Sequence, residues 1–516
     1  MGVVVLGFAL RLRGIHDPLL DHPGWRQGDT AAIARNFATL DLNPFHPQAD
    51  YDGPPPNYVE LELQIVPFLA ALLYKLFGIH EIFGRLISIG FSLGTVCLLA
   101  EFARRIFVSE AAGILAAFLF AVYPGSVYYG RTFMPDTAMV FFLTAALYAA
   151  VRWLDEVESD SWARFWAAAL LCAAAILAKP VAAVGLVPIA ALMFARRGLV
   201  KTLLHPQYYA YFAIALLPYA GYDAYLRSIA EWHWASGIVA KHVLPSLSDS
   251  VSSVANFRHK LAAFRDALAL LWSTMLGPFA CALFAIAIAV PVRPAARPLV
   301  FAWLGALLAY AYVVVTVERV DYYLYPVLPL AALWSAGSLD RALSFVPAWR
   351  ERRMAALPAL LALCSLAIFF TPSPVRAYYR YNKDVFRAAR ALDAGLKPGT
   401  LVVMGHYDPS VLYYIDRKGW EEDPYLWTPF DEQSAIRKGA RYFIAIERRR
   451  LERNVELYAW LQRFPVIDPD AKWPVYQTDY AKMLPGAEAR WRAFRRREKA
   501  RQQNNGAAPA EGRTPR

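Results

Sequence analysis

The feature that most constrains this chain is a series of long apolar runs that recurs from the N-terminus to about residue 371. Several of them, such as 108–127 and 354–370, approach the roughly 20 residues that cross a bilayer as a helix. Hydrophobic residues make up 57% of the chain and charged residues 19%, against about 45–50% and about 25% in a soluble domain. A soluble core can bury one or two such helices, but not a series. The sequence therefore predicts an all-α polytopic membrane protein.

We expect about eleven membrane-spanning helices, with a further apolar helix at 63–78 lying along the membrane surface as an interfacial helix. The first span is short and is flanked by Arg11 and Arg13. Either the chain starts further upstream or this helix is tucked under its neighbours. The expected spans are 1–12, 84–103, 108–127, 136–153, 163–178, 181–196, 207–226, 267–291, 298–316, 325–339 and 354–371.

The charge pattern predicts the orientation of these helices. With the N-terminus inside, the basic clusters fall on cytoplasmic connections, and Lys and Arg resist translocation. Much of the net charge of +12 is explained in this way, so it does not indicate a nucleic-acid partner. Three regions are then expected outside: a first loop at 13–62, a loop at 227–262, and the chain after about 373. The cytoplasmic clusters are Arg104–Arg105, Arg152, Arg196–Arg197–Lys201, Arg293–Arg297 and Arg350–Arg352–Arg353.

The chain accordingly divides into three parts. Residues 1–372 form the transmembrane domain with its first outer loop. Residues 373–486 predict a small α/β domain on the outer, periplasmic side, with strands at 400–405 and 441–446 and a helix at 383–395. Residues 487–516 are polar and basic and predict a disordered tail.

The first loop contains the segment HPGWRQGDTAAIARNF at 22–37. Arg26, Gln27 and Asp29 stand at the start of an expected helix, where Asp29 or Thr30 could simply act as the N-cap. A second acidic site, Glu60 and Glu62, precedes the surface helix.

Further charged residues fall where spans meet the outer surface: Arg131, Asp136, Lys179, Arg319 and Asp321. Ionisable groups near a membrane are costly to desolvate, so they usually face a polar cavity or each other. An Arg131–Asp136 ion pair, snorkelling cations and belt tyrosines such as Tyr323 are the purely structural alternatives. Because these residues come from distant stretches yet emerge on one face, we expect the cations to hold a phosphate and a carboxylate to take a proton.

Together these motifs resemble the bacterial members of the protein O-mannosyltransferase superfamily, membrane glycosyltransferases of the C fold related to the transferase that adds aminoarabinose to lipid A. The resemblance covers most of residues 10–340, through their order and spacing. The motifs are GWRQGDTAAIARNF, LLYKLFG (72–78), YYGRTFMPD, LAKP, RVDYYLYPVLP and, in the C-terminal part, GHYDPSVLYYIDRKGW (405–420).

The resemblance implies that a sugar is transferred, with inversion, from a polyprenyl-phosphate carrier to an envelope acceptor (lipid A, a glycan or a protein) at the periplasmic face of the bacterial inner membrane. Asp29 would be the catalytic base or its orienting partner, and Asp136 and Glu62 would correspond to the other outer acids. The donor would be contacted by Arg26, Gln27, Arg131, Lys179, Arg319 and Tyr323.

Two departures from the pattern bear on the chemistry. Leu63-Gln64 follow Glu62 where relatives often carry Lys-Pro, so Arg26, Arg131 or Lys179 would have to replace that phosphate ligand. A single acid, Asp29, stands where many relatives have two, which weakens a two-carboxylate metal site. Assistance by a divalent cation is left open. The alternative functions are a polytopic transporter or lipid-linked glycan flippase, a ligase that moves a whole glycan, and a structural assembly factor.

Overall fold

The computed structural model describes residues 1–155, 161–371, 373–467 and 472–506. Their contacts divide the chain into two compact units. The first unit contains residues 1–23, 33–47 and 58–381. The second contains 24–32, 48–57 and the chain from 382 onward. Each unit is described by itself.

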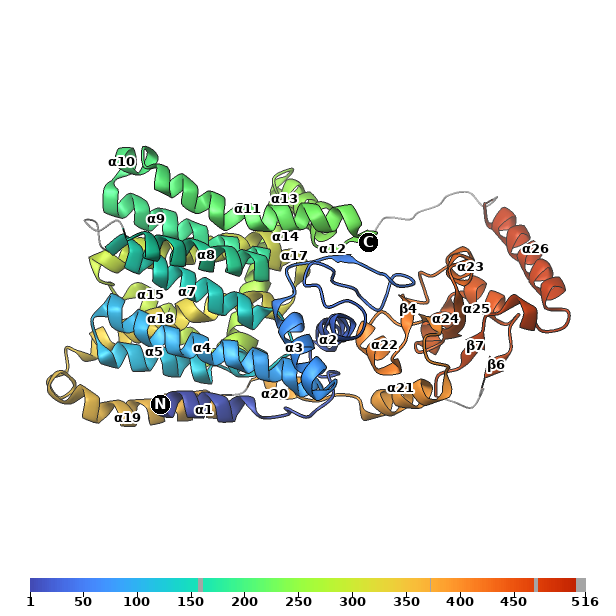
Figure 1. The fold of residues 1–516 in the computed structure, drawn as a ribbon, viewed down its shortest axis with the longest axis horizontal. Coiled ribbons are helices and arrows are strands. Elements are labelled where there is room, and N and C mark those ends of the chain that lie inside the picture. Colours follow the sequence, from blue (N-terminus) through green and yellow to red (C-terminus); the bar gives the residue numbers. More distant parts are fainter. Residues whose placement is uncertain (156–160, 372, 468–471, 507–516) are drawn as a thin grey trace. The chain divides into compact units, whose positions relative to one another are not determined.

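The first unit is a bundle of helices (Figure 1). Its main helices are α1 (Gly2–Arg11), α3 (Ile65–Phe77), α4 (Glu81–Phe107), α5 (Glu110–Val122), α6 (Pro124–Tyr129), α7 (Asp136–Asp155), α8 (Trp162–Ala178), α9 (Leu186–Arg197), α11 (Pro206–Ile229), α14 (Val254–Leu270), α15 (Gly277–Ala289), α16 (Arg297–Tyr310), α18 (Val327–Leu343) and α19 (Pro347–Phe370). A short parallel pairing joins β1 (Val59–Glu60) to β2 (Trp232–His233).

The core of the bundle is built around α5, which packs against α4, α18 and α1. This helix consists almost entirely of Ala, Leu, Ile, Phe, Val and Gly after its first residue. Small residues let the backbones approach closely: a Cβ at Gly113 would lie 2.5 Å from the carbonyl oxygen of Ala100 in α4. Close packing of this kind is typical of helices associating in a membrane.

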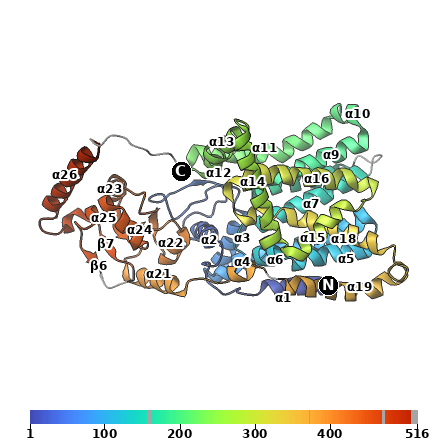
Figure 2. The ribbon, with the colours of Figure 1, turned by 180° about the vertical axis from the view of Figure 1, so that it is seen from behind.

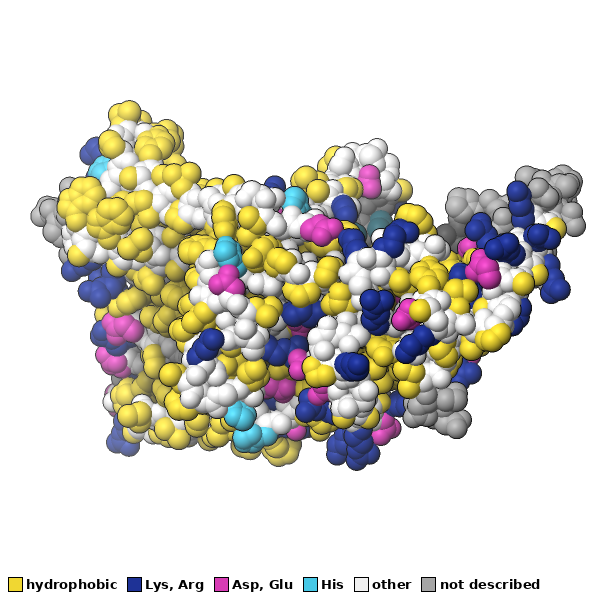
Figure 3. Space-filling view, turned by 45° about the vertical axis from the view of Figure 1, so that its right-hand side comes forward, with side chains coloured by type: hydrophobic (Ala, Val, Ile, Leu, Met, Phe, Trp, Pro, Cys, Tyr) yellow, Lys and Arg dark blue, Asp and Glu magenta, His cyan; other side chains and the backbone are white. Residues whose placement is uncertain are grey.

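The chain is a multi-pass membrane protein. Within the described residues, five helices are long and apolar enough to cross a bilayer, or six if one bent pair counts as a span. Large apolar side chains also face outward, among them Leu217, Ile286 and Leu363 at 66%, 63% and 63% exposure. Hydrophobic side chains cover much of the first unit in Figure 3. Soluble proteins rarely expose such continuous apolar surface. The larger count of eleven spans stays a prediction.

The expected span 267–291 is not one straight helix. A helical stretch ends at Met275, α15 begins at Gly277, and the two are bent by 120°. Gly277 adopts a φ of +77°, which glycine tolerates better than other residues, and Pro278 lies in the first turn of the new helix, where proline is favoured. The region 227–262, expected to be a loop, also contains helix, because α14 already begins at Val254. Figure 2 shows α14 and α15 from behind.

The structure also describes the two short apolar segments near the N-terminus. Helix α3 has 13 residues and would be about 20 Å long, shorter than the hydrocarbon core. Helix α1 packs against α4 and α5. Its last residue, Arg11, is fully buried and donates hydrogen bonds to Ser92 (3.0 Å) and Ser126 (2.8 Å).

The second unit contains a five-stranded sheet in the order β4-β3-β5-β7-β6. The β3–β4 and β3–β5 pairs are parallel, and β5–β7 and β6–β7 are antiparallel. The expected strands and helix of this region have counterparts in β3, β5 and α21. The elements are α21 (Lys383–Gly395), β3 (Leu401–Met404), α22 (Pro409–Ile415), β4 (Lys418–Glu421), α23 (Pro429–Arg437), β5 (Ala440–Ile444), α24 (Arg448–Arg453), α25 (Val455–Leu461), β6 (Val466–Ile467) and β7 (Val475–Gln477).

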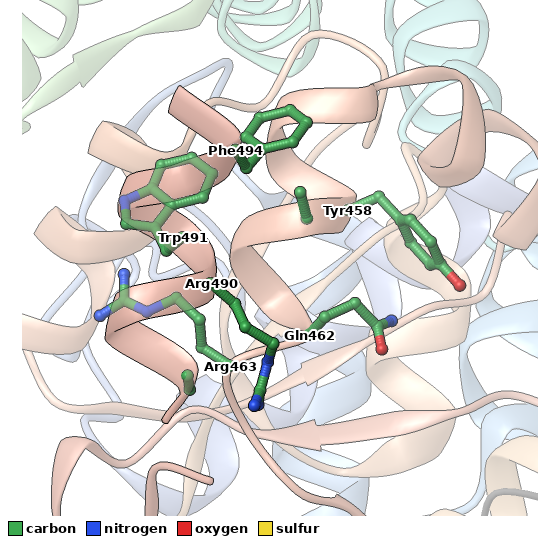
Figure 4. A pocket seen from close by; sticks show the side chains of 8 residues that line it. Tyr458, Gln462, Arg463, Arg490, Trp491 and Phe494 are labelled. Carbon is green, nitrogen blue, oxygen red and sulfur yellow. The ribbon is translucent and has the colours of Figure 1, made fainter. Parts of the chain in front are cut away.

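The start of the expected disordered tail is helical instead. Helix α26 spans Ala487–Gly506, and residues 507–516 lie outside the described part of the chain. Trp491 is buried and its ring stacks on Phe494 at 5.5 Å. Figure 4 shows both rings beside Tyr458 and Arg463 around a pocket of about 310 Å³. The packing of Trp491 and Phe494 therefore stabilises the start of α26, although the overall composition of this segment is polar and basic.

Candidate functional site

Lys179 and Asp136 form a buried ion pair in the first unit. Lys179 ends α8 because the following Pro180 favours an extended backbone at this position. Asp136 opens α7, where the helix dipole favours a negative charge. The Lys179 Nζ lies 2.7 Å from Asp136 Oδ1, and both side chains are at most 10% exposed. Oδ2 of Asp136 has no hydrogen-bond partner among the described residues.

Two tyrosine rings cover this pair. The Nζ of Lys179 lies 5.1 Å from the ring centre of Tyr322 and 4.9 Å from that of Tyr323, within the range of cation–π attraction. The structure thus brings together three of the residues singled out in the sequence, namely Asp136, Lys179 and Tyr323. The ammonium group of Lys179 therefore lies between the carboxylate of Asp136 and two tyrosine rings.

Arg131 does not pair with Asp136. It forms an ion pair with Asp21, which also lies 3.3 Å from Arg85, and all three side chains are fully buried. Arg85 further donates to the carbonyl groups of Gly14 (2.7 Å) and Ile15 (3.1 Å). The three residues therefore fasten the start of the first loop to α4 and to the turn after α6. Asp21 directly precedes the motif at 22–37 and was not among the predicted site residues.

A second buried acid that was not given a role is Asp321. It accepts hydrogen bonds from the hydroxyls of Tyr129 (2.5 Å) and Tyr378 (2.8 Å), and His22 lies 3.5 Å away. Burial alone would raise the pKa of Asp321, but the nearby His22 and the hydrogen bonds from Tyr129 and Tyr378 lower it below its usual value. Asp321 is therefore a charged anchor between the first loop and the later helices.

The remaining predicted residues of the first unit lie as follows. Glu62 is buried, and the side chain of Gln64 donates to its backbone carbonyl at 2.8 Å. Its neighbour Glu60 is fully buried and accepts from the backbone and hydroxyl of Ser236, both at 3.1 Å. Arg319 is exposed, with a φ of +45°. Glu60 thus links the first loop to the region after residue 227.

Asp29 lies in the second unit, inside a helix rather than at its cap. Helix α2 (Gly24–Thr39) begins after Pro23, so neither Asp29 nor Thr30 is the N-cap. Asp29 Oδ2 is 2.9 Å from the Arg26 guanidinium, one helical turn earlier. Its Oδ1 accepts a hydrogen bond from the Tyr51 hydroxyl at 3.0 Å. Asp29 is 2% exposed, and the neighbouring Gln27 is fully buried.

A further acid of the second unit, Glu421, was missed. It ends β4 and is buried, and burial together with the charges of Asp52, Glu422, Asp29 and Asp408 raises its pKa well above the usual value. In the sequence Glu421 is far from the first loop, and only the fold brings it near the first-loop acids Asp29 and Asp52.

Within the described residues, no group of three or more His, Cys, Asp or Glu side chains is arranged to hold a metal ion. Assistance by a divalent cation stays an open hypothesis.

Residues 64–222 match the family of dolichyl-phosphate-mannose-protein mannosyltransferases. No curated protein sequence matches the chain. Among solved structures, the chain is similar to ArnT from Cupriavidus metallidurans bound to undecaprenyl phosphate, with a TM-score of 0.64 and 14% identity over 94% of this chain and 98% of that one.

The chain is also similar to the Archaeoglobus fulgidus oligosaccharyltransferase, with a TM-score of 0.59 and 12% identity over 94% of this chain and 75% of that one. A complex of that protein, AglB, with an inhibitory peptide and a dolichol-phosphate gives a TM-score of 0.55 at 13% identity, with the same coverage of both chains. At such low sequence identities, the structural likeness shows a shared fold alone. The resemblance seen in the sequence is confirmed: the chain has the C fold of these membrane glycosyltransferases and matches the mannosyltransferase family over residues 64–222.

Proposed function

We propose that this protein is an inverting glycosyltransferase that moves a sugar from a polyprenyl-phosphate carrier to an acceptor in the cell envelope. The observation that carries the proposal is the buried Asp29–Arg26 pair, in which a carboxylate and a guanidinium lie 2.9 Å apart. A carboxylate can take a proton from an acceptor, and a guanidinium can bind phosphate oxygens. The fold shared with a protein crystallised with undecaprenyl phosphate supports this choice of carrier.

In the proposed reaction, Asp29 accepts the proton of the acceptor group as that group bonds to the anomeric carbon of the sugar. The bond from this carbon to the phosphate oxygen breaks on the opposite face, so the configuration inverts. The leaving polyprenyl phosphate gains a negative charge. Arg26 and Lys179 are assigned to stabilise that charge, and Gln27, Arg131, Arg319 and Tyr323 to contact the donor.

The two other acids are given supporting roles. Asp136 fixes Lys179 through their ion pair, and Glu62 is assigned to the acceptor side. We further propose about eleven membrane crossings, a cytoplasmic N-terminus, and an active site on the periplasmic face of the bacterial inner membrane. Nucleotide sugars are not expected outside the cytoplasm, whereas a carrier lipid presents its sugar there. The second unit is proposed to be periplasmic.

A ligase that transfers a whole glycan is the second candidate, favoured by the structural likeness to an oligosaccharyltransferase. The same acid and cations would serve it. The mass of the group added to the acceptor distinguishes the two functions, because a single sugar and an assembled glycan differ by whole residues.

The test uses a deletion strain. Mass spectrometry of lipid A, glycans and envelope proteins identifies the sugar that is lost, and a plasmid copy restores it. Asp29→Asn keeps the size of the side chain but removes the base, so we expect transfer to fall by about 10²–10⁴-fold while the protein still accumulates in the membrane. Asp249→Asn, at an exposed acid, is the matched control and should restore the sugar fully. Full restoration by Asp29→Asn would overturn the proposal.

A further inference from the structure

Two pieces of the first loop belong to the same compact unit as the C-terminal part of the chain. Residues 24–32, which carry Asp29, and residues 48–57 cluster with the chain from 382 onward. The contact residues are far apart in sequence: Asp50 and Lys418 are separated by 368 positions. This association is specific in its geometry, as three separate contacts show.

The first contact is between backbones. β4 is an edge strand of the sheet, and its Gly419 donates to the carbonyl of Asp50 (2.9 Å) and accepts from the N–H of Gly53 (2.8 Å). Gly53 and Gly419 form an antiparallel bridge. Gly419 has a φ of +149°, and a Cβ there would lie 1.9 Å from the carbonyl oxygen of Val402. The first loop therefore extends the sheet edge at a position that only glycine can occupy.

The second contact is an ion pair between Lys418 and Asp50, with Nζ and Oδ1 2.8 Å apart. The side chain of Asp50 is 2% exposed and that of Lys418 is 20% exposed. If one partner of a buried pair is removed, the other charge stays buried without compensation. This strongly disfavours the packing of the loop segment against β4. The pair thus reinforces the register set by the backbone bonds.

The third contact joins the two helices. A Cβ at Gly28 would lie 2.4 Å from the Cα of Ser410 in α22. Gly28 immediately precedes Asp29, so α2 rests on α22 at the turn that carries the acid. We call these three contacts, made by Gly28, Asp50 and Gly53 with Ser410, Lys418 and Gly419, the loop clamp.

The loop clamp acts directly beside Asp29. Tyr51 lies between Asp50 and Gly53, is 6% exposed, and donates its hydroxyl proton to Asp29. Arg26 contacts the other carboxylate oxygen. Burial and the nearby charges of Asp29, Glu421 and Asp52 raise the pKa of Tyr51 well above its usual value, so its hydroxyl stays a donor. Both oxygens of Asp29 therefore have partners, and one of these partners, Tyr51, lies in the loop segment 48–57 that the loop clamp holds.

We propose that the C-terminal α/β part of the chain is a positioning device for the reaction, in which the loop clamp holds Tyr51 and Tyr51 orients the carboxylate of Asp29. The inference rests on the proposed function of Asp29. It assigns Tyr51 as a positioning residue and gives the C-terminal part a task within the active site. Without the clamp, Asp29 can rotate away from the acceptor, and turnover falls while the donor still binds.

Tyr51→Phe tests the positioning role. The substitution removes one hydrogen bond to a charged group and leaves the packing of the ring. We expect kcat in membrane preparations to fall by about 10–100-fold, with the KM for the identified polyprenyl-phosphate donor unchanged. Tyr58→Phe, in the same loop, is the matched control and should leave both constants unchanged. An unchanged kcat for Tyr51→Phe, with Asp29→Asn inactive, would overturn the inference and leave the proposed function intact.

Lys418→Met tests the clamp itself in the full-length protein. We expect faster hydrogen exchange in peptides covering 48–57 and reduced kcat, and we expect Asp50→Lys combined with Lys418→Asp to recover part of both. Lys397→Met, at an exposed lysine, is the control. Normal kcat together with increased exchange at 48–57 would show that the clamp does not position the acid. If Asp29→Asn were active instead, the proposed function would fail first.

Discussion

At the scale of single residues, the molecule relies on buried charges that are held in pairs. Asp136 with Lys179, Asp29 with Arg26, and Asp21 with Arg85 and Arg131 are all largely shielded from water. Removing one partner of a buried ion pair lowers the free energy of unfolding strongly, because the other charge stays buried alone. Replacing both partners by apolar groups lowers it less. Each of these pairs can therefore be examined by comparing single with double substitutions.

Lys179→Met is expected to destabilise the protein by about 3–5 kcal/mol, because Asp136 is left as an unpaired buried charge. The double variant Lys179→Met/Asp136→Leu should recover most of that stability but no sugar transfer. Stability is measured as the temperature at which half of the detergent-purified protein remains monodisperse. Lys75→Met, at an exposed lysine, should not shift that temperature. A double variant as unstable as the single one would contradict the explanation.

The sequence predicted which charged residues matter better than it predicted their partners. Lys179, Asp136 and Tyr323 were all singled out, and they lie together. Arg131 was considered as a partner of Asp136, yet it pairs with Asp21. Spacing along the chain places both acids near the same membrane surface, and only the packing of helices decides between them. Asp29 similarly gains Tyr51 from a turn whose position depends on the C-terminal part of the chain.

At the scale of elements, helix boundaries follow local sequence where glycine and proline are present. The Gly277-Pro278 pair that breaks the expected span 267–291 is a turn signal, so this break was readable. Helix α2 starts five residues before Asp29, after Pro23. The aromatic anchors of α26 are also visible in sequence, but their effect depends on contact with α25. Composition alone therefore predicted disorder for 487–506, where the structure has a helix.

Helix α23 contains a buried acid that makes stability depend on pH. Glu432 is fully buried, and burial raises its pKa to about 8, although Trp427 donates to it at 2.9 Å. The folded state therefore prefers the protonated acid. The contribution of Glu432 to the free energy of unfolding is fully present below the usual pKa of about 4.5. This contribution is lost as the pH rises through about 8.

Glu432→Gln removes this titration and should stabilise the second unit above pH 8 by on the order of a few kcal/mol. Pulse proteolysis in urea at a series of pH values measures the midpoint for cleavage within this unit. Glu456→Gln, at an exposed acid, should leave the wild-type pH dependence in place. An equally steep pH dependence for Glu432→Gln would show that another group is responsible.

At the scale of the whole molecule, the series of long apolar runs predicted a multi-pass helical protein, and the structure and its likeness to solved structures support that class. The number of crossings does not follow as directly. Several apolar helices are shorter than 18 residues, such as Trp162–Ala178 and Glu110–Val122, and length alone does not decide whether they span. Orientation rests on the basic clusters, which can be tested directly.

Single cysteines in a background lacking the four native ones test the orientation. Asp249→Cys and Lys397→Cys should react with a membrane-impermeant maleimide in intact spheroplasts. Lys201→Cys and Arg293→Cys should react only after the membrane is permeabilised, because their clusters are expected inside. All four positions are exposed. Labelling of position 201 or 293 in intact spheroplasts would overturn the proposed orientation.

The loop clamp has a consequence for biosynthesis. Asp50 is synthesised 368 residues before Lys418, so in the proposed topology the acid-bearing loop crosses the membrane long before its anchor exists. During that interval the loop clamp cannot form. A chain truncated before β4 lacks Lys418 and Gly419, so under the proposed function we expect it to transfer no sugar. Under the proposed function, sugar transfer can therefore begin only once the last quarter of the chain has been made.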